Sequence, residues 1–281
     1  MTDPGTGRPR TYPHGVPCWV DTEQPDVDAA LAFYGELFGW EFEDRLPPGA
    51  GGRYVVASLG GAPVAAVASR DGAAEGTPEW VTYIAVDDVD AAARGVEDLE
   101  GVVLDGPTTV GSAGRMAVVQ DRQGATSRFW EPDERLGAQR VNEPGTWNFS
   151  ILRTPDPERA LHFYGPLLGW EVDPDLGAGM VRVVGYGDHL ARTVDPGIHA
   201  RQASLPPAFA DVAAGLDRAD GPARFVVTFA VADRDASAAV AERAGATVLS
   251  TGQNDWAREA VLRDPQGAEL TISQFAPVRP V

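Results

Sequence analysis

The chain repeats one long motif, and this repetition limits what it can fold into more than any other feature. The stretch FYGELFGWE, from Phe33 to Glu41, returns as FYGPLLGWE, from Phe163 to Glu171. Two more motifs repeat further on: VTYIAVDD at Val81 to Asp88 with VVTFAVAD at Val226 to Asp233, and DRQGA at Asp121 with DPQGA at Asp264. Similarity of this length predicts two related copies, and 281 residues are enough for two domains.

The spacing between the copies locates an insertion. It is 130 residues for the first motif (163 minus 33) but 145 for the second (226 minus 81), so extra residues are expected in the second copy, at about 195–222. A polar stretch bounded by glycines separates the copies. The predicted organisation is a tail at 1–14, a first domain at 15–135, a linker at 136–145 and a second domain at 146–277.

A shorter repeat divides each copy in two. The residues DVDAA occur at Asp26 and again at Asp88, and looser forms begin at Asp156 and Asp233. Each follows an apolar strand-like run and precedes an Ala-rich helical one, where an acid caps free backbone N–H groups and meets the positive end of the helix dipole. The pattern predicts an α+β fold of four β-α-β-β-β modules, with these acids as structural helix caps.

The helical stretch after the first cap has one apolar stripe. Its members are Ala30, Phe33, Tyr34, Leu37 and Phe38, followed by Gly39 where a left-handed helix end favours glycine. We expect these aromatic residues, and Tyr164 in the second copy, to be core residues and not catalytic acids.

Composition excludes several classes of function. A net charge of −18 opposes binding to nucleic acid or to anionic membranes, and no apolar run is long enough to span a bilayer. The one cysteine, Cys18, is expected to be a buried thiol, and the first residues lack the apolar core of a signal peptide. A cytoplasmic protein is expected.

In their order, these motifs resemble the vicinal oxygen chelate superfamily, which includes glyoxalases, bleomycin-resistance proteins and dioxygenases. The resemblance rests on PD.D.A..FY..LFGW, W..Y.AVDDVDAA and D..GA...FW.P, and it covers most of residues 15–132 and 146–277. It is greatest to the tandem two-domain actinobacterial subgroup. It implies that the four modules form two tandem cup-shaped half-barrels.

The family's chemistry normally uses a divalent metal held by His on a module's first strand and Glu or His on its last. The matching positions here hold Trp19, Val81, Phe149 and Val226 on first strands, and Arg128 and Thr271 on last strands. None of these side chains is an imidazole or carboxylate ligand, so we predict no metal and no cofactor. Among the histidines, His189 is the best remaining candidate; we interpret it as a lone strand residue, matched to Ala62 in the first copy.

Strand alternation predicts which residues line each cup. In the first they are Pro17, Trp19, Asp21, Val81, Tyr83, Arg128 and Trp130, and in the second Trp147, Phe149, Ile151, Val226, Thr228, Thr271 and Ser273. Aromatic walls with a few polar groups suit a small-molecule pocket, and the second cup is expected to carry no charge. Alternatively, Asp21 and Arg128 pair with each other and the aromatic residues fill the cup.

Two arginines recur at matching places, Arg115 and Arg258. Either they clamp an anionic ligand at the rim of the cup, or they form ion pairs with nearby acids such as Asp121 and Asp264. We expect the ion pairs.

Three interpretations of function stay open at this point. The preferred one is a metal-free protein that binds or sequesters an aromatic or amphipathic metabolite or antibiotic. The second is a glyoxalase-, dioxygenase- or lyase-like enzyme, either metal-independent, with Asp21 as base and Arg128 or Tyr83 steadying an anion, or with metal ligands not recognised above. The third is a scaffold whose cups are filled by their own side chains. The expected assembly is a monomer or a homodimer.

Overall fold

A computed structural model describes residues 8–47, 49, 51–70, 76–177 and 179–277. Residues 1–7 of the predicted tail lie outside these ranges. The strands form two open eight-stranded sheets, in the orders β2-β3-β4-β1-β5-β8-β7-β6 (sheet A) and β10-β11-β12-β9-β13-β16-β15-β14 (sheet B). The two orders correspond strand for strand, which confirms the predicted α+β fold of repeated modules. Within the described ranges, no helix is long and apolar enough to cross a membrane.

The first copy contains two modules. The first consists of β1 (Pro17–Gln24), α1 (Val27–Phe38), β2 (Glu41–Asp44), β3 (Tyr54–Leu59) and β4 (Ala62–Ser69). The second consists of β5 (Trp80–Ala85), α2 (Val89–Asp98), β6 (Val102–Val110), β7 (Gly114–Gln120) and β8 (Thr126–Pro132).

The second copy also contains two modules, the first of which is interrupted by short helices. It consists of β9 (Trp147–Thr154), α3 (Pro157–Leu168), β10 (Trp170–Val172), the 3-10 helix η1 (Pro174–Leu176), β11 (Met180–Val183), α4 (Tyr186–Thr193), α5 (Ile198–Arg201), the 3-10 helix η2 (Phe209–Asp211) and β12 (Val212–Arg218). The last module consists of β13 (Arg224–Ala230), α6 (Arg234–Arg243), β14 (Thr247–Gln253), β15 (Ala257–Arg263) and β16 (Glu269–Phe275).

The recurring acids are helix caps, as predicted. Asp26, Asp88, Asp156 and Asp233 each precede a helix, and each side chain accepts a hydrogen bond from the backbone N–H three residues later. At the other end of α1, Gly39 adopts a left-handed conformation with φ of 72° and donates its N–H to the carbonyl of Gly35. A residue with a Cβ would be strained there.

Contacts divide the chain into two compact units that cut across the sequence copies. One comprises residues 1–18, 82–137 and 150–225, and the other 19–81, 138–149 and 226–281. The first unit therefore holds most of the two middle modules, and the second most of the first and last modules. The boundaries predicted from the repeats describe the copies and stay a prediction.

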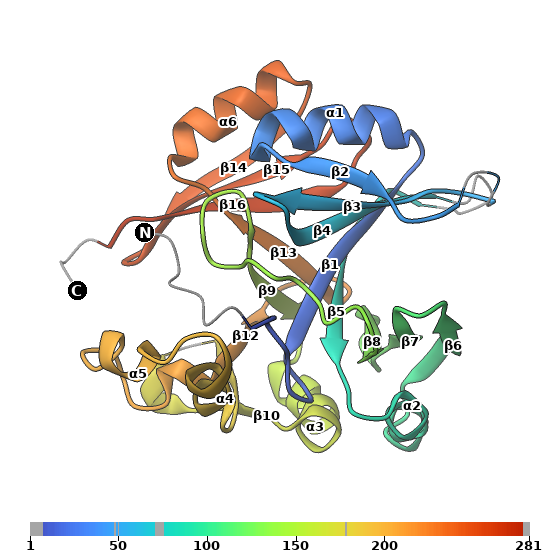
Figure 1. Ribbon diagram of the computed structural model, residues 1–281. Helices are drawn as coiled ribbons and strands as arrows, with labels where there is room; N and C mark the ends of the chain where they lie inside the picture. The colour runs from blue at the N-terminus through green and yellow to red at the C-terminus, as the bar shows by residue number, and fades with distance from the viewer. Residues whose placement is uncertain (1–7, 48, 50, 71–75, 178, 278–281) are drawn as a thin grey trace. The chain divides into compact units, whose positions relative to one another are not determined.

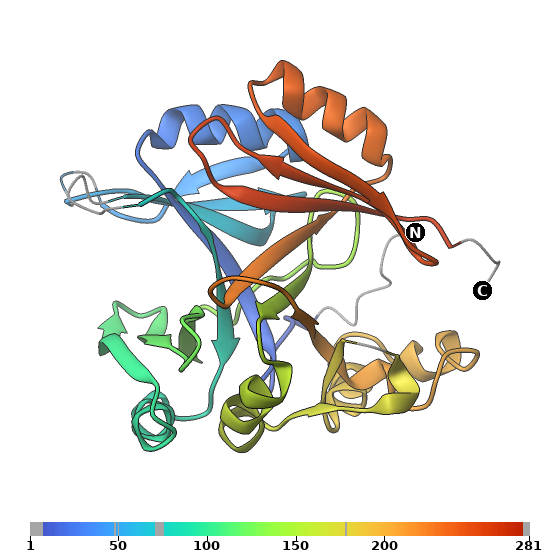
Figure 2. The same ribbon diagram turned by 180° about the vertical axis from the view of Figure 1, so that it is seen from behind.

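Within each unit, two helices from different copies pack together. Helix α1 lies against α6 in the second unit, as Figure 1 and Figure 2 show from opposite sides. Helix α2 lies against α3 in the first unit. We call the face of each sheet that carries these helices the helix face, and the opposite face the inner face.

A buried tyrosine joins the copies in each unit. In the second unit, the Tyr34 hydroxyl donates to Oδ2 of Asp264 at 2.7 Å and accepts from Nε1 of Trp80 at 3.0 Å. The same Oδ2 accepts from Nε2 of Gln24 at 2.9 Å. In the first unit, the Tyr164 hydroxyl donates to Oδ2 of Asp121 at 3.1 Å. Both tyrosines are fully buried, so their interpretation as core residues is confirmed.

The aspartates in these bonds also shape the turns in which they lie. Oδ1 of Asp121 accepts from the backbone N–H groups of Gln123 and Ala125, and Oδ1 of Asp264 accepts from those of Gln266 and Ala268. The FYG and D.QGA motifs are thus the two halves of one interaction, and each half comes from a different copy.

The connection between β11 and β12 is where the second copy departs from the first. The first copy joins β3 to β4 through Gly60 and Gly61, whereas residues 184–211 form two short helices and a 3-10 turn. The interpretation of His189 as a strand residue is wrong: it lies in α4, and its Nε2 is 3.0 Å from Oγ1 of Thr11. Gly185, with φ of 86°, ends the extended backbone, and Tyr186 and Leu190 bury one side of the helix that follows.

We predict that Tyr34→Phe destabilises the protein more than Tyr164→Phe. The first substitution removes the partner of two groups, the Asp264 carboxylate and the Trp80 indole, whereas the second removes one longer bond. Leaving a buried polar group without a partner costs about 1–3 kcal/mol. Urea unfolding of the two variants tests this. Equal small losses would mean that the Tyr34 network contributes little.

A second prediction concerns alkaline pH. Burial, reinforced by the charge of the neighbouring aspartate, raises the pKa of Tyr34 and of Tyr164 well above the ordinary value of 10.0. Above about pH 10 the unfolded chain loses these protons while the native protein keeps them, so stability falls as pH rises, by about 1.4 kcal/mol per pH unit for each tyrosine. The double Phe variant should show a shallower loss of unfolding free energy between pH 10 and 11. If the unfolding free energy of the variant fell as steeply with pH as that of the unmodified protein, the two tyrosines would not be its cause.

Candidate functional site

The inner face of β1 carries two of the predicted site residues. Trp19 and Asp21 are both buried, and Tyr54 of β3 connects them. Nε1 of Trp19 donates to the Tyr54 hydroxyl at 3.0 Å, and that hydroxyl donates to Oδ2 of Asp21 at 3.2 Å. Sequence reasoning missed Tyr54 because it considered only first and last strands. The alternation of side chains along its strand could have placed Tyr54 on the inner face.

Three other predicted residues meet on the inner face of the first unit. Tyr83 and Arg128 are register partners on the parallel strands β5 and β8. Nη1 of Arg128 donates to the Tyr83 hydroxyl at 2.8 Å, and the guanidinium carbon lies 5.3 Å from the centre of the Tyr83 ring. The Trp130 ring meets the Tyr83 ring edge-on at 6.2 Å. These large side chains therefore cover this part of the face by packing on one another, as the scaffold interpretation expects.

The two recurring arginines form ion pairs, but with acids other than those predicted. Nη1 of Arg115 is 2.5 Å from Oδ2 of Asp90, and Nη2 of Arg258 is 2.6 Å from Oδ2 of Asp235. Both acids lie in the first turn of the helix that follows their cap. The hydrogen bond from Arg115 lowers the pKa of Asp90.

Asp121 and Asp264, which we named as examples of partners for these arginines, bond to tyrosines instead. The expectation failed because it chose acids that lie close to each arginine in the sequence. The strand that carries each arginine runs beneath the helix of its own module, which brings the helix acid closer.

The inner face of sheet B in the second unit is built from smaller residues. Thr228 and Thr271 are register partners on β13 and β16. Their neighbours Phe229 and Ile272 point the other way, and the Phe229 ring lies 4.9 Å from that of Phe38 on α1. The two threonines therefore face inward, where the predicted residues Phe149 and Val226 are half-buried.

Three polar atoms on this face are buried without a hydrogen-bond partner among the described residues. They are Nε1 of Trp147, Oγ1 of Thr228 and Oγ1 of Thr271. Each residue is 5% exposed or less. A buried polar group without a partner costs about 1–3 kcal/mol, and a water, an ion or a ligand can supply the missing hydrogen bond. These three atoms are the clearest chemical signal for a ligand in the second unit.

The predicted absence of charge on this face is wrong. Glu259 of β15 pairs in register with Ser273 of β16, so the two side chains share the inner face. Oγ of Ser273 donates to Oε1 of Glu259 at 3.4 Å. Alternation in AREAVLR places Arg258 on the helix face beside Asp235 and Glu259 on the inner face, but the sequence analysis did not consider this middle strand.

Corresponding register pairs show how far the two copies have diverged. The pairs Tyr83 with Arg128 and Met116 with Trp130 in sheet A correspond to Thr228 with Thr271 and Glu259 with Ser273 in sheet B. Large, stacked side chains have been replaced by small hydroxyls and one carboxylate. The second face is therefore the one with hydrogen-bonding groups to offer.

The donor set does not fit the metal that the fold family normally holds. The positions expected to bind it carry Trp19, Val81, Phe149, Val226, Arg128 and Thr271. Within the described residues, no three His, Cys, Asp or Glu side chains gather as a metal site would require. Cys18 is buried, as predicted, and burial raises the pKa of its thiol, so it is a poor thiolate donor.

Comparison with known proteins gives matches over both copies. Residues 24–129 match the Glyoxalase/Bleomycin resistance protein/Dioxygenase superfamily, and residues 148–273 match a glyoxalase-like domain. "Putative glyoxylase CFP32" of Mycobacterium tuberculosis is 39% identical, over 95% of this chain and 97% of that protein. "Anthracycline biosynthesis protein DnrV" of Streptomyces peucetius is 33% identical, over 93% of this chain and 94% of that protein.

Solved structures agree on the fold. The Mn(II)-bound glyoxalase from Novosphingobium aromaticivorans superposes with a TM-score of 0.61 at 17% identity, over 93% of this chain and 82% of that chain. The 2,2',3-trihydroxybiphenyl 1,2-dioxygenase from Sphingomonas wittichii gives 0.57 at 14% identity, over 95% and 92%. At these identities the likeness concerns the fold alone.

We predict that Thr228→Val and Thr271→Val each raise the stability of ligand-free protein by about 1–3 kcal/mol. Valine has nearly the shape of threonine but lacks the hydroxyl, and removing a buried group that has no partner removes a cost. The matched control is Thr82→Val, because Oγ1 of buried Thr82 is 2.8 Å from Oγ of Ser150. The control should lose about 1–2 kcal/mol. Urea unfolding of refolded protein measures all three, and a loss at residues 228 and 271 as large as the control's would show that their hydroxyls have partners.

Proposed function

Because this chain belongs to the glyoxalase/bleomycin resistance protein/dioxygenase superfamily, we propose that it is a metal-free protein that binds an aromatic or amphipathic small molecule on the inner face of sheet B. The observation that carries the proposal is the group of three buried polar atoms without partners among the described residues: Nε1 of Trp147 and the hydroxyls of Thr228 and Thr271. A bound ligand would supply the missing hydrogen bonds.

The residues of this face set the chemistry of the ligand. The Trp147 indole can only donate, whereas a threonine hydroxyl can donate and accept, so the ligand needs at least one acceptor oxygen. Glu259 adds an acceptor beside Ser273. Phe149 and Val226 provide an apolar surface for a ring system. An oxygenated aromatic molecule meets these requirements, and the Streptomyces relative named for anthracycline biosynthesis is in keeping with such a ligand.

Binding without a metal follows from the residues at the family's metal positions. Trp19, Phe149 and Val226 have no lone pair suited to a divalent cation, and the Arg128 guanidinium would repel one. A protein with these residues would hold its ligand by packing and hydrogen bonds. Sequestration requires no more than this.

The second candidate is a metal-independent enzyme with Asp21 as base. The observation in its favour is that Asp21 is fully buried and accepts a hydrogen bond from Tyr54, which is the kind of environment in which carboxylates act as bases. The name of the mycobacterial relative, a putative glyoxylase, fits this candidate. Asp21→Asn would abolish turnover by such an enzyme but would leave sequestration on sheet B intact.

Native mass spectrometry of the chain, purified without chelators or a metal-affinity step, tests the proposal. The expected spectrum shows no stoichiometric divalent ion and a retained organic adduct. The adduct should disappear from the Thr228→Val/Thr271→Val double variant and persist in Thr82→Val. One divalent ion per chain would contradict the metal-free assignment, and an adduct that both variants retain would place the ligand elsewhere.

A further inference from the structure

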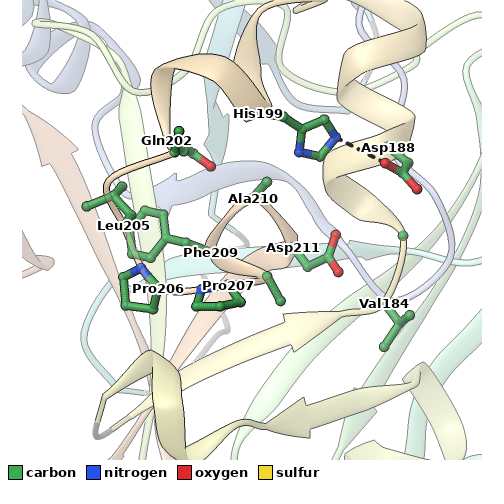
Figure 3. Close-up of a pocket in the computed structure, with 13 residues that line it drawn as sticks. Val184, Asp188, His199, Gln202, Leu205, Pro206, Pro207, Phe209, Ala210 and Asp211 are labelled. Carbon is green, nitrogen blue, oxygen red and sulfur yellow. Dashed lines mark hydrogen bonds and ion pairs between the residues drawn. The ribbon is translucent and has the colours of Figure 1, made fainter.

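The connection between β11 and β12 forms a second candidate site, which opens to solvent and is separate from the inner faces of the sheets. A cavity of about 440 Å³ lies among residues 184–211, and all of its lining residues come from this one segment. The first copy cannot form it, because Gly60 and Gly61 alone join the corresponding strands. The cavity therefore belongs to the insertion itself, and Figure 3 shows it in close-up.

One side of the cavity is apolar. Leu205, Pro206, Pro207 and Phe209 gather there, as Figure 3 shows. Val184, which is 64% exposed, also lines the cavity. Proline rings and a phenylalanine form a rigid wall of the kind that packs against a flat or compact hydrocarbon body.

The other side offers mainly hydrogen-bond acceptors. Oδ1 of Asp188 is 3.0 Å from Nε2 of His199, and Oδ1 of Asp211 accepts from the backbone N–H of Gly187 at 2.8 Å, which ties η2 to the start of α4. Oε1 of Gln202 is buried without a hydrogen-bond partner among the described residues. Asp188 and Asp211 place two carboxylates on this side, so a ligand that donates hydrogen bonds and carries positive charge complements it.

We propose that this cavity binds an organic cation: a compact apolar body that bears a protonated amine. The apolar body would lie against Pro206, Pro207 and Phe209, and the ammonium would point towards Asp188 and Asp211. The aromatic ring of Phe209 adds a favourable surface for a cation. This site is independent of the ligand proposed for sheet B, so either can fail without the other.

Three probes with the same naphthalene ring and different charges distinguish charge from shape. They are 1-naphthylmethylamine, which is cationic at neutral pH, 1-naphthylmethanol, which is neutral, and 1-naphthylacetate, which is anionic. Isothermal titration calorimetry should give the amine at least a tenfold lower Kd than the alcohol, a difference of about 1.4 kcal/mol, and no measurable binding of the acetate. Equal affinity for the amine and the alcohol would overturn the proposal.

Variants locate the binding. Asp188→Asn and Asp211→Asn remove one negative charge each while keeping an acceptor oxygen, so the new amide oxygen at position 211 can still accept from Gly187 and the turn is preserved. Each should remove most of the preference for the amine. Ala203→Trp, at an exposed lining position, should block the cavity without altering its charge. The matched control is Asp175→Asn, an exposed aspartate of η1 outside the cavity, which should bind the amine like the unmodified protein.

Two further results would overturn the proposal. One is amine binding that survives both Asp188→Asn and Ala203→Trp. The other is amine binding that is lost in the Thr228→Val/Thr271→Val variant, because it would then occur on sheet B. The same threonine variant can also support both proposals. It would do so if it lost the organic adduct seen by native mass spectrometry and still bound the amine.

Discussion

A buried hydrogen bond between a tyrosine of one copy and an aspartate of the other underlies the whole architecture. A carboxylate as enclosed as that of Asp264 is tolerated only when its oxygens are satisfied, and here the Tyr34 hydroxyl, the Gln24 amide and two backbone N–H groups satisfy them. Helix α1, strand β1 and the turn before β16 are therefore fixed by one side chain. Because tyrosine and aspartate come from different copies, neither copy can complete its own core, and each compact unit takes modules from both.

This constraint acts on the helix face and leaves the inner face free to change. Tyr34 and Tyr164, with their aspartate partners, are the same in both copies. On the inner faces of the sheets, the copies differ. Tyr83, Arg128 and Trp130 of the first copy correspond to Thr228, Thr271 and Ser273 of the second. Since successive residues of a strand point to opposite faces, one face can diverge while the other keeps the core intact. The two units can thus share a fold and differ in what they offer a ligand.

The sequence predicted what depends on local rules and failed where a contact depends on tertiary structure. Helix caps such as Asp26 and the left-handed Gly39 need only a few neighbouring residues, so they were predictable. The partner of Arg115 was not, because the Asp90 carboxylate reaches it from the overlying helix. Glu259 was missed because motif alignment draws attention to first and last strands. His189 was misplaced because an insertion breaks the correspondence between copies on which its strand assignment depended.

The buried threonine hydroxyls of sheet B show how a free-energy cost to the folded protein can indicate a function. Thr228 and Thr271 lie at a register pair that the other copy fills with tyrosine and arginine, and valine would fit there with no polar group to bury. Each buried hydroxyl without a partner costs the folded protein about 1–3 kcal/mol, and no interaction with the described residues offsets that cost. Packing alone would therefore favour valine at both positions. Under the proposed function, a molecule that binds after folding would form the hydrogen bonds that the chain leaves open at these two hydroxyls.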